Sequence, residues 1–340
     1  MINRRSFIKA SALAGAGLTL GSSLFAQEKT AGKRVGIIGL DTSHSIAFTK
    51  AMNDPAAGNK FGGYTIVAAY PKGSLDIQSS VDRIEGYTND MRKLGVEIVG
   101  SVEELLTRAD VFMLETNDGR RHLEQALPVL KAGKRLFIDK PMAASLSDAL
   151  AIFAAADQYG VPVFSASSLR YIKGMKEVKE GSAGKILGAE AFSPAALEKT
   201  HPDFFWYGIH GVETLFTAMG PGCKSVVRIT TPDTDMAVGI WSDGRIGSFR
   251  GLRAGKKDYG GTIFGEKAIV QLGAYNGYNP LLEEIIRFFQ TGIEPVDRQE
   301  TIEIMAFMEA ADLSKKKKGV PVSIDMIMEK ASKAGKKALK

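Results

Sequence analysis

Cysteine is nearly absent from this sequence, and histidine is scarce: 340 residues include one Cys and four His. A single cysteine, Cys223, excludes an internal disulfide, and no Cys/His spacing typical of a structural metal site occurs. We expect Cys223 to be a buried structural thiol. The residue pattern therefore predicts a protein without a bound metal.

A hydrophobic run long enough to span a membrane is also missing. The first 26 residues contain Arg4 and Arg5, then Lys9, then a mildly apolar run rich in Ala and Gly that ends near Ala26. That run is too short and too weak to form a stable span. The segment resembles a twin-arginine export signal, with an amphipathic helix as the alternative. We therefore predict a periplasmic or otherwise exported protein that has no integral membrane span once the signal is removed.

A basic surface is lacking too, although the formal net charge is +6. The first 26 residues contribute +3 and the segment from Lys315 onward contributes +7, which leaves −4 for residues 27–314. No nucleic-acid partner is implied. The four lysines at 315–318 are typical of a solvated helix end or tail, with a membrane-surface or acidic-partner role as the alternative.

From residue 33 the chain alternates short apolar runs with amphipathic ones. The apolar runs predict strands at 34–40, 64–70, 110–115, 134–141 and 161–166, and the segments between them predict helices. This alternation is typical of a parallel, doubly wound α/β sheet, whose ligands lie at the carboxyl ends of the strands. We therefore predict a Rossmann-like nucleotide-binding domain over 33–166, preceded by the signal (1–26) and a linker (27–32).

From about Ser167 the pattern changes to extended runs punctuated by glycine, crossed by one predicted helix at 208–220. Asp243-Gly244 between two such runs predicts a hairpin. We expect an open, mostly antiparallel sheet, followed by two helices. The expected organisation is a C-terminal α+β domain for substrate binding and oligomerisation at 167–325, and a basic tail at 326–340.

Two segments carry a resemblance to a known family. The stretch AGKRLFIDKPMAASLSDA (132–149) resembles the A-G-K-x-V-x-x-E-K-P-x-A motif of the Gfo/Idh/MocA family, the glucose-fructose oxidoreductase and inositol dehydrogenase group. The stretch ETNDGRRHLEQALPVLKAGK (115–134) is similar to that family's fourth-strand loop and helix. The resemblance covers most of 33–325. It implies an NAD(P)-dependent enzyme, a small carbohydrate substrate and a homo-oligomer formed through the open sheet.

By the same resemblance, Lys140 contacts both the nicotinamide ribose and the substrate. A lysine at a strand end can donate to a substrate oxygen, or accept a proton if desolvation lowers its pKa. His210 is similar to the family's candidate proton acceptor, but Trp206 replaces the acid one turn earlier. We predict Lys140 and His210 to be catalytic, with Tyr207 as a stand-in for the absent acid. The alternatives are a surface lysine and a core histidine.

Three further residues are predicted to bind the substrate: Arg170, Tyr171 and Trp206. Arg170 and Tyr171 follow the last predicted strand of the nucleotide domain, where the family often has a basic residue that reaches the substrate. For Arg170 the alternative is a hinge residue that pairs with backbone groups, and for Trp206 it is core packing.

The first strand ends in a loop that departs from the dinucleotide fingerprint G-x-G-x-x-G. Gly39 can form the tight turn, but Asp41 and His44 stand at the second and third glycine positions. Asp41 either repels a phosphate or turns inward to cap the following helix. His44 either separates helix from strand or faces the ligand. Thr42 and Ser43 can still donate to a phosphate.

The second strand has no acid at its end for the ribose hydroxyls of NAD. Lys72 and Ser74 follow it and are suited to a 2′-phosphate, so NADP is favoured over NAD, with a plain turn as the alternative for Lys72. The predicted nucleotide-binding residues are Gly39, Asp41, Thr42, Ser43, His44, Lys72, Ser74, Thr116, Asn117, His122, Asp139 and Lys140.

The sequence leaves three functions open. The first is an exported NAD(P)-dependent oxidoreductase that acts on a sugar or polyol hydroxyl or carbonyl. The second is an enzyme that holds NAD(P) tightly through a closed redox cycle, for glycoside cleavage or epimerisation. The third is a non-catalytic sugar-binding protein on the same scaffold, which the altered loop favours. We expect the first.

Overall fold

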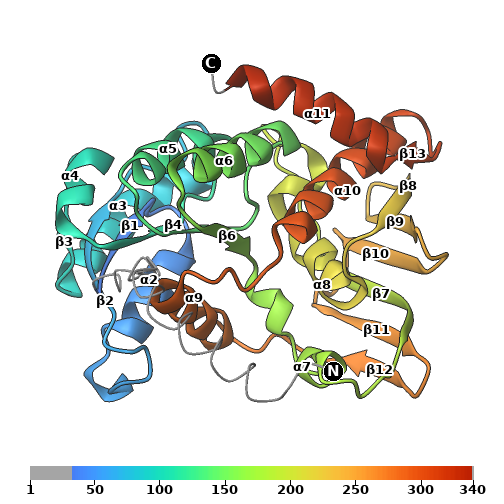
Figure 1. Cartoon of the computed structure of the whole chain (residues 1–340), viewed down its shortest axis with the longest axis horizontal. Coiled ribbons are helices and arrows are strands. Elements are labelled where there is room, and N and C mark those ends of the chain that lie inside the picture. The colour runs from blue at the N-terminus through green and yellow to red at the C-terminus, as the bar shows by residue number, and fades with distance from the viewer. Residues whose placement is uncertain (1–32, 339–340) are drawn as a thin grey trace, which may run out of the picture. The chain divides into compact units, whose positions relative to one another are not determined.

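The computed structural model describes residues 33–338, so the predicted signal and linker lie outside the described residues. Within this range the chain builds two sheets and the helices that cover them (Figure 1). The prediction of a parallel nucleotide-type sheet joined to a mostly antiparallel one is confirmed.

Sheet A has six strands in the order β3-β2-β1-β4-β5-β6, all parallel. The order reverses direction between β1 and β4, which is where doubly wound sheets bind their ligands. β3 escaped prediction because two residues are too few to show a pattern. The strands are β1 (Arg34–Ile38), β2 (Thr65–Tyr70), β3 (Glu97–Ile98), β4 (Val111–Leu114), β5 (Leu136–Asp139) and β6 (Val163–Ala166).

Both faces of sheet A are buried, which explains its continuous apolar strands. Ile38 and Leu114 face one core, whereas Ile37 and Met113 face the other. The first core is covered by α4 (Val102–Arg108), α5 (His122–Lys131) and α6 (Leu146–Tyr159). The second is covered by α2 (Ser43–Met52), α3 (Gln78–Lys93) and α9 (Asn279–Thr291), the last arriving from far along the sequence.

Sheet B has the order β12-β11-β7-β10-β9-β8-β13, and only its β7–β10 pair is parallel. The predicted hairpin joins β9 to β10. The strands are β7 (Ile186–Pro194), β8 (Cys223–Thr230), β9 (Thr234–Trp241), β10 (Ile246–Leu252), β11 (Gly260–Gly265), β12 (Ile269–Leu272) and β13 (Val322–Ser323).

One face of sheet B is covered by α8 (Ile209–Met219) and α10 (Arg298–Lys316). A Cβ on Gly211 would lie 2.2 Å from the ring of Phe249, so glycine lets α8 approach β10 closely. The opposite face exposes apolar side chains, namely Leu187, Ile229, Ile240, Ile246 and Ile269. This exposed apolar face is the surface expected to pack against another subunit.

The C-terminal segment is a helix packed on the fold rather than a tail. Most of it belongs to α11 (Ile324–Ala338), which packs against α6 and α10. Ile324, Ile327 and Ala331 are buried at helical spacing. The sequence analysis predicted a tail because the many lysines of this segment outweigh its few apolar residues. The run of four lysines does end a helix, because α10 stops at Lys316.

Replacing one buried residue of α11 tests this packing. Ile327→Asp puts a carboxylate where the native side chain is 3% exposed, so we expect a loss of about 2–4 kcal/mol in the free energy of unfolding. Met326→Asp is the matched control, because Met326 is 43% exposed. Urea unfolding measures both, and equal stabilities would contradict the packing of α11.

Candidate functional site

The predicted nucleotide loop keeps its tight turn. Gly39 adopts a φ of 92°, and a Cβ there would lie 2.4–2.6 Å from atoms of Thr116. Only glycine fits this combination of dihedral and space. The first position of the fingerprint therefore has its usual structural role.

Asp41 bridges the loops that follow three strands. Its Oδ2 accepts hydrogen bonds from the backbone N–H and the hydroxyl of Ser74, both at 2.7 Å. Its Oδ1 accepts from the backbone N–H of Asn117 at 2.9 Å. The predicted capping role of Asp41 is wrong, because Thr42 caps α2 instead, accepting from the N–H of His44 at 3.4 Å. The Asp41 carboxylate occupies donors that the sequence assigned to a cofactor.

The residues present still fit a dinucleotide in part. The glycine turn is intact, and the weak cap leaves the first turn of α2 open to a phosphate. The prediction that Ser74 binds a 2′-phosphate is wrong for this geometry, since its hydroxyl and its amide both donate to Asp41. Lys72 is exposed and is free of this constraint.

His122 connects two loops from the interior. Its Nε2 lies 2.7 Å from the carbonyl oxygen of Thr116, and its Nδ1 lies 3.2 Å from that of Met142. Burial lowers the pKa of His122, so the ring is neutral and donates one hydrogen bond at a time. This position makes His122 a brace between the loops after β4 and β5.

Asp139 and Lys140, at the end of β5, meet His44 from the start of α2. The Nδ1 of His44 donates to Oδ2 of Asp139 at 2.9 Å, and the Nζ of Lys140 lies 3.3 Å from the same oxygen. Burial alone would raise the pKa of Asp139, but the charges of His44 and Lys140 hold it well below its usual range. His44 thus faces the site, and its ring lies edge-on against Tyr278 at 4.8 Å.

Lys140 stays charged in this setting. Burial would lower its pKa, but the charge and hydrogen bond of Asp139, with smaller contributions from Tyr207 and Glu115, together offset burial and keep the pKa above its ordinary value. The idea that desolvation turns Lys140 into a base is therefore corrected: its neighbours make it a hydrogen-bond donor. Its side chain is 9% exposed.

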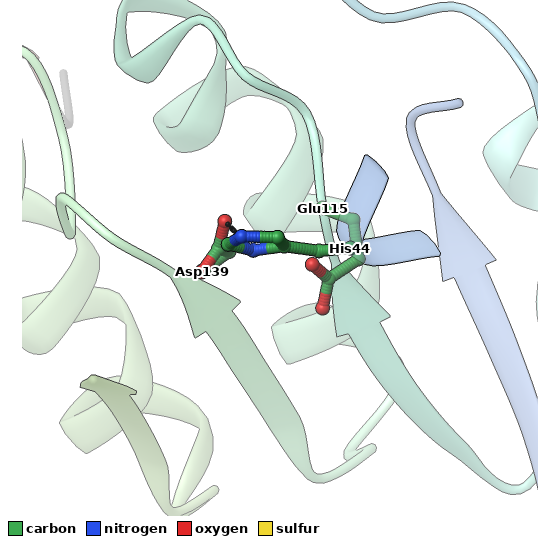
Figure 2. Close-up of side chains that lie close together, drawn as sticks. All are labelled: His44, Glu115 and Asp139. Atoms are coloured by element: carbon green, nitrogen blue, oxygen red, sulfur yellow. Dashed lines mark hydrogen bonds and ion pairs between the residues drawn. The ribbon is translucent and has the colours of Figure 1, made fainter. Parts of the chain in front are cut away.

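Glu115, at the end of β4, is a site residue that the sequence analysis missed. It is 0% exposed, and neither carboxyl oxygen has a hydrogen-bond partner among the described residues. Burial and the charge of Asp139 raise the pKa of Glu115 well above its usual range. Figure 2 shows Glu115 beside His44 and Asp139, where β4 and β5 end. It was missed because DVFMLE shows only an apolar strand.

His210 projects into the site from α8. Its Nδ1 lies 2.7 Å from the hydroxyl of Ser167, which follows β6. When Nδ1 donates to Ser167, Nε2 keeps a lone pair that can accept a proton. Burial and the charge of Lys140 lower the pKa of His210 well below its ordinary value, so the ring is neutral. Ser167 provides the orientation that the missing acid was expected to provide.

The segment before His210 is a π-helix, Phe204–Gly208. Its wider turn invalidates the α-helical count that assigned the acid's position to Trp206. The ring of Trp206 packs against His201 at 5.1 Å, whereas Tyr207 lies edge-on to His210 at 5.1 Å. The structure therefore brings Tyr207 to His210 and sets Trp206 against a different histidine.

A row of tyrosines that the sequence analysis did not identify lines the same region. The hydroxyls of Tyr207 and Tyr259 lie 3.3 Å apart. The ring of Tyr275 lies 6.4 Å from that of Tyr259 and 5.6 Å from that of Tyr278. The tyrosine row (Tyr207, Tyr259, Tyr275 and Tyr278) thus connects His210 to His44. Aromatic rings with polar tips suit a sugar ring.

Arg170 does not have the position expected of a substrate ligand. Its guanidinium is buried, 2.6 Å from Glu300 and 3.4 Å from Glu213. Arg170 and Tyr171 line a separate cavity of about 520 Å³ with residues of α7 (Met175–Lys179) and α9. The side-chain partners of Arg170 are therefore carboxylates rather than the backbone groups we expected.

Comparisons with known proteins agree with this geometry. A family model described as "Oxidoreductase family, NAD-binding Rossmann fold" matches residues 33–167, and a model of the twin-arginine translocation signal matches residues 1–21. The second match confirms the predicted export signal. No helix in the described part of the chain is long and apolar enough to cross a membrane.

Among curated proteins, 1,5-anhydro-D-fructose reductase from Ensifer adhaerens is 35% identical over 101 residues, or 28% of this chain. The matched stretches span 30% and 40% of the two curated relatives found.

Two solved structures illustrate the fold. A probable dehydrogenase from Thermotoga maritima is 19% identical with a TM-score of 0.70, over 86% of this chain and 99% of that one. The scyllo-inositol dehydrogenase from Lactobacillus casei with bound NAD(H) and scyllo-inositol is 15% identical with a TM-score of 0.68, over 87% and 100%. At these identities the likeness shows the shared fold.

Asp41→Asn tests the bridge between the three loops. The substitution replaces one acceptor oxygen by an N–H donor that faces donors, so we expect the free energy of unfolding to fall by about 1–3 kcal/mol. Asp82→Asn on the exposed side of α3 is the control. If both variants unfold at the same denaturant concentration, the bridge contributes nothing.

Glu213 predicts a pH dependence of stability. Burial raises its pKa to about 7, against the opposing charge of Arg170 and the N–H of Ser167. The folded pKa lies above the unfolded one, so the stabilising contribution is full below about pH 4.5 and is lost as the pH rises toward 7. Glu213→Gln should remove this decline, measured as unfolding free energy at pH 5 and pH 7.5. Persistence of an equal decline in the variant would assign it to another group.

Proposed function

Because residues 33–167 belong to the Gfo/Idh/MocA oxidoreductase family, we propose that this chain is an exported NAD(P)-dependent oxidoreductase acting on a hydroxyl or carbonyl of a sugar or polyol. One observation carries the proposal. Lys140, paired with Asp139 at the end of β5, and His210, oriented by Ser167 directly after β6, are both buried at the carboxyl edge of sheet A.

The substrate class is supported by the tyrosine row and by two relatives. One relative is named a reductase of 1,5-anhydro-D-fructose, and one structural neighbour contains scyllo-inositol with NAD(H). Both are small polyhydroxylated rings. A sugar or cyclitol packed on Tyr207 and Tyr259 would place a ring hydroxyl beside His210.

The proton steps are assigned to residues of this chain. The chemistry that a bound nicotinamide would supply is hydride transfer to or from the carbinol carbon. The Lys140 ammonium donates a hydrogen bond to the substrate oxygen. Nε2 of His210 accepts the hydroxyl proton in oxidation and returns it in reduction, while Ser167 orients the ring. Tyr207 positions the substrate next to His210.

For the nucleotide, we propose that Gly39, Thr42 and Ser43 hold the pyrophosphate. The preference for NADP over NAD now depends on Lys72 alone, because Ser74 is bound to Asp41. We retain the other predicted partners, a small carbohydrate and a second copy of this chain. The exposed apolar face of sheet B supports the second partner.

A closed redox cycle with a tightly held cofactor is the second candidate. The observation that favours it is burial: Lys140, Asp139 and His210 are all buried in this structure. A site with so little exposure is suited to retaining its nucleotide, and an exported enzyme has no cytoplasmic pool with which to exchange it. Retention through turnover distinguishes this candidate from the first.

The direct test is to denature the mature protein, purified from its export route, and assay for released nicotinamide nucleotide. Bound nucleotide, or binding of added NAD(H) or NADP(H), is the expected result. Absence of both would leave the non-catalytic sugar-binding protein as the function of this scaffold.

Lys140→Ala tests the catalytic assignment. Loss of the donor at the substrate oxygen should lower kcat/KM by at least about a hundredfold for any substrate that the wild type turns over. Lys131→Ala, an exposed position at the end of α5, is the control and should match the wild type. Unchanged turnover by the Lys140 variant would remove that residue from the mechanism.

A further inference from the structure

We propose that His44, Glu115 and Asp139 bind one divalent transition-metal ion, such as Zn²⁺ or Mn²⁺, at the carboxyl edge of sheet A. The inference does not rest on the proposed redox function, because its test measures the metal. It revises the prediction of a protein without a metal, which considered only Cys/His spacing. These three residues are distant in sequence, so only the fold brings them together.

The three donors are close enough to share an ion. One imidazole nitrogen and one oxygen from each carboxylate lie within 4.8 Å of one another. Tetrahedral bonds of about 2.0–2.2 Å put two donors on one ion about 3.3–3.6 Å apart, so small side-chain rotations that bring the donors together by up to about 1.5 Å are enough. An imidazole with two carboxylates is a donor set that suits these metals.

Unpaired oxygen atoms are the second, independent observation. Both oxygens of Glu115 and Oδ1 of Asp139 are buried and have no hydrogen-bond partner among residues 33–338. Three such acceptors in one place cost free energy unless something binds them. A proton on Glu115 could join only two of these oxygens, so the third would stay without a donor. A metal ion can bind all three oxygens, with Glu115 bidentate, together with the imidazole.

The scaffold holds the three side chains on well-ordered elements. Glu115 directly follows β4, Asp139 is the last residue of the adjacent β5, and His44 lies in the first turn of α2 (Figure 2). All three meet near the point where the strand order of sheet A reverses. Sites built on strand ends and helix starts need little reorganisation to bind an ion.

The local charge also has room for a cation. With His44 as the neutral imidazole that a metal requires, Lys140, 3.3 Å from Asp139, supplies the one positive charge against the two carboxylates. Binding a divalent ion would replace the His44–Asp139 hydrogen bond by two metal bonds and free Lys140 to turn toward the tyrosine row. Three protein ligands leave at least one position for water or for a substrate oxygen, which the ion would polarise.

The test is metal binding to the mature protein after removal of metals with a chelator and desalting. We expect about one Zn²⁺ or Mn²⁺ per chain by calorimetric titration and elemental analysis, and a rise in Tm on addition of the ion. Glu115→Gln should weaken binding at least about tenfold. Glu124→Gln on α5, where the native side chain is 72% exposed, is the matched control and should bind like the wild type.

Two results would overturn the proposal. One is no stoichiometric binding of either ion to the wild type. The other is equal affinity in the wild type and the Glu115 variant, which would place the ion elsewhere. If Glu115→Gln does not fold, His44→Gln replaces it in the same titration, because it removes one ligand from a partly exposed position. Metal binding without bound nucleotide, or the reverse, separates this proposal from the proposed function.

Discussion

Charge burial at the carboxyl edge of sheet A is the constraint on which the rest of the structure depends. Asp41, Glu115 and Asp139 all lie there with almost no exposure. Asp41 accepts three hydrogen bonds. Asp139 accepts a hydrogen bond from His44 and pairs with the ammonium of Lys140. Glu115 has no hydrogen-bond partner among the described residues. The first arrangement fixes the loops after β1, β2 and β4, and the second fixes the position of Lys140. The Glu115 oxygens, which lack a hydrogen-bond donor among the described residues, can be satisfied by a proton or by a bound ligand.

The unusual first loop and the missing acid after β2 are related, because Asp41 of the first loop places its carboxylate next to the residues that follow β2. Dinucleotide sites usually place an acid after the second strand, facing the ribose. Here the acid comes from the first loop, at Asp41, and points toward the backbone that follows β2. The same edge of the sheet therefore still contains a carboxylate, but it serves the protein's own N–H groups.

Most of the fold followed from the sequence because hydrophobic period is a local property. The alternating strands and helices of sheet A, the hairpin at Asp243-Gly244 and α8 were all predicted. The features that were not predicted depend on contacts between residues distant in sequence. The buried face of α11 is recognisable only once α6 and α10 are seen to cover it. Ser167, Glu115 and Tyr278 likewise reach the site only through the fold. The π-helix before His210 changes which residues lie on the same side of the helix as His210, whereas the sequence argument assumed α-helical spacing. Lys140 and His210 were predicted through a family motif, whereas the residues that contact them carry no motif.

The unpaired Glu115 bears on whether the site is active or a remnant. A buried carboxyl group without a partner costs about 1–3 kcal/mol, and an apolar residue of similar size would remove that cost. An unpaired buried carboxyl group lowers the stability of the fold without a structural benefit, and such exceptions concentrate at functional sites. The same reasoning applies to Lys140, because its charged side chain is buried next to Asp139 although most lysines lie on the surface. A scaffold that only bound a sugar would need neither group, which is why the geometry favours chemistry at this edge of the sheet.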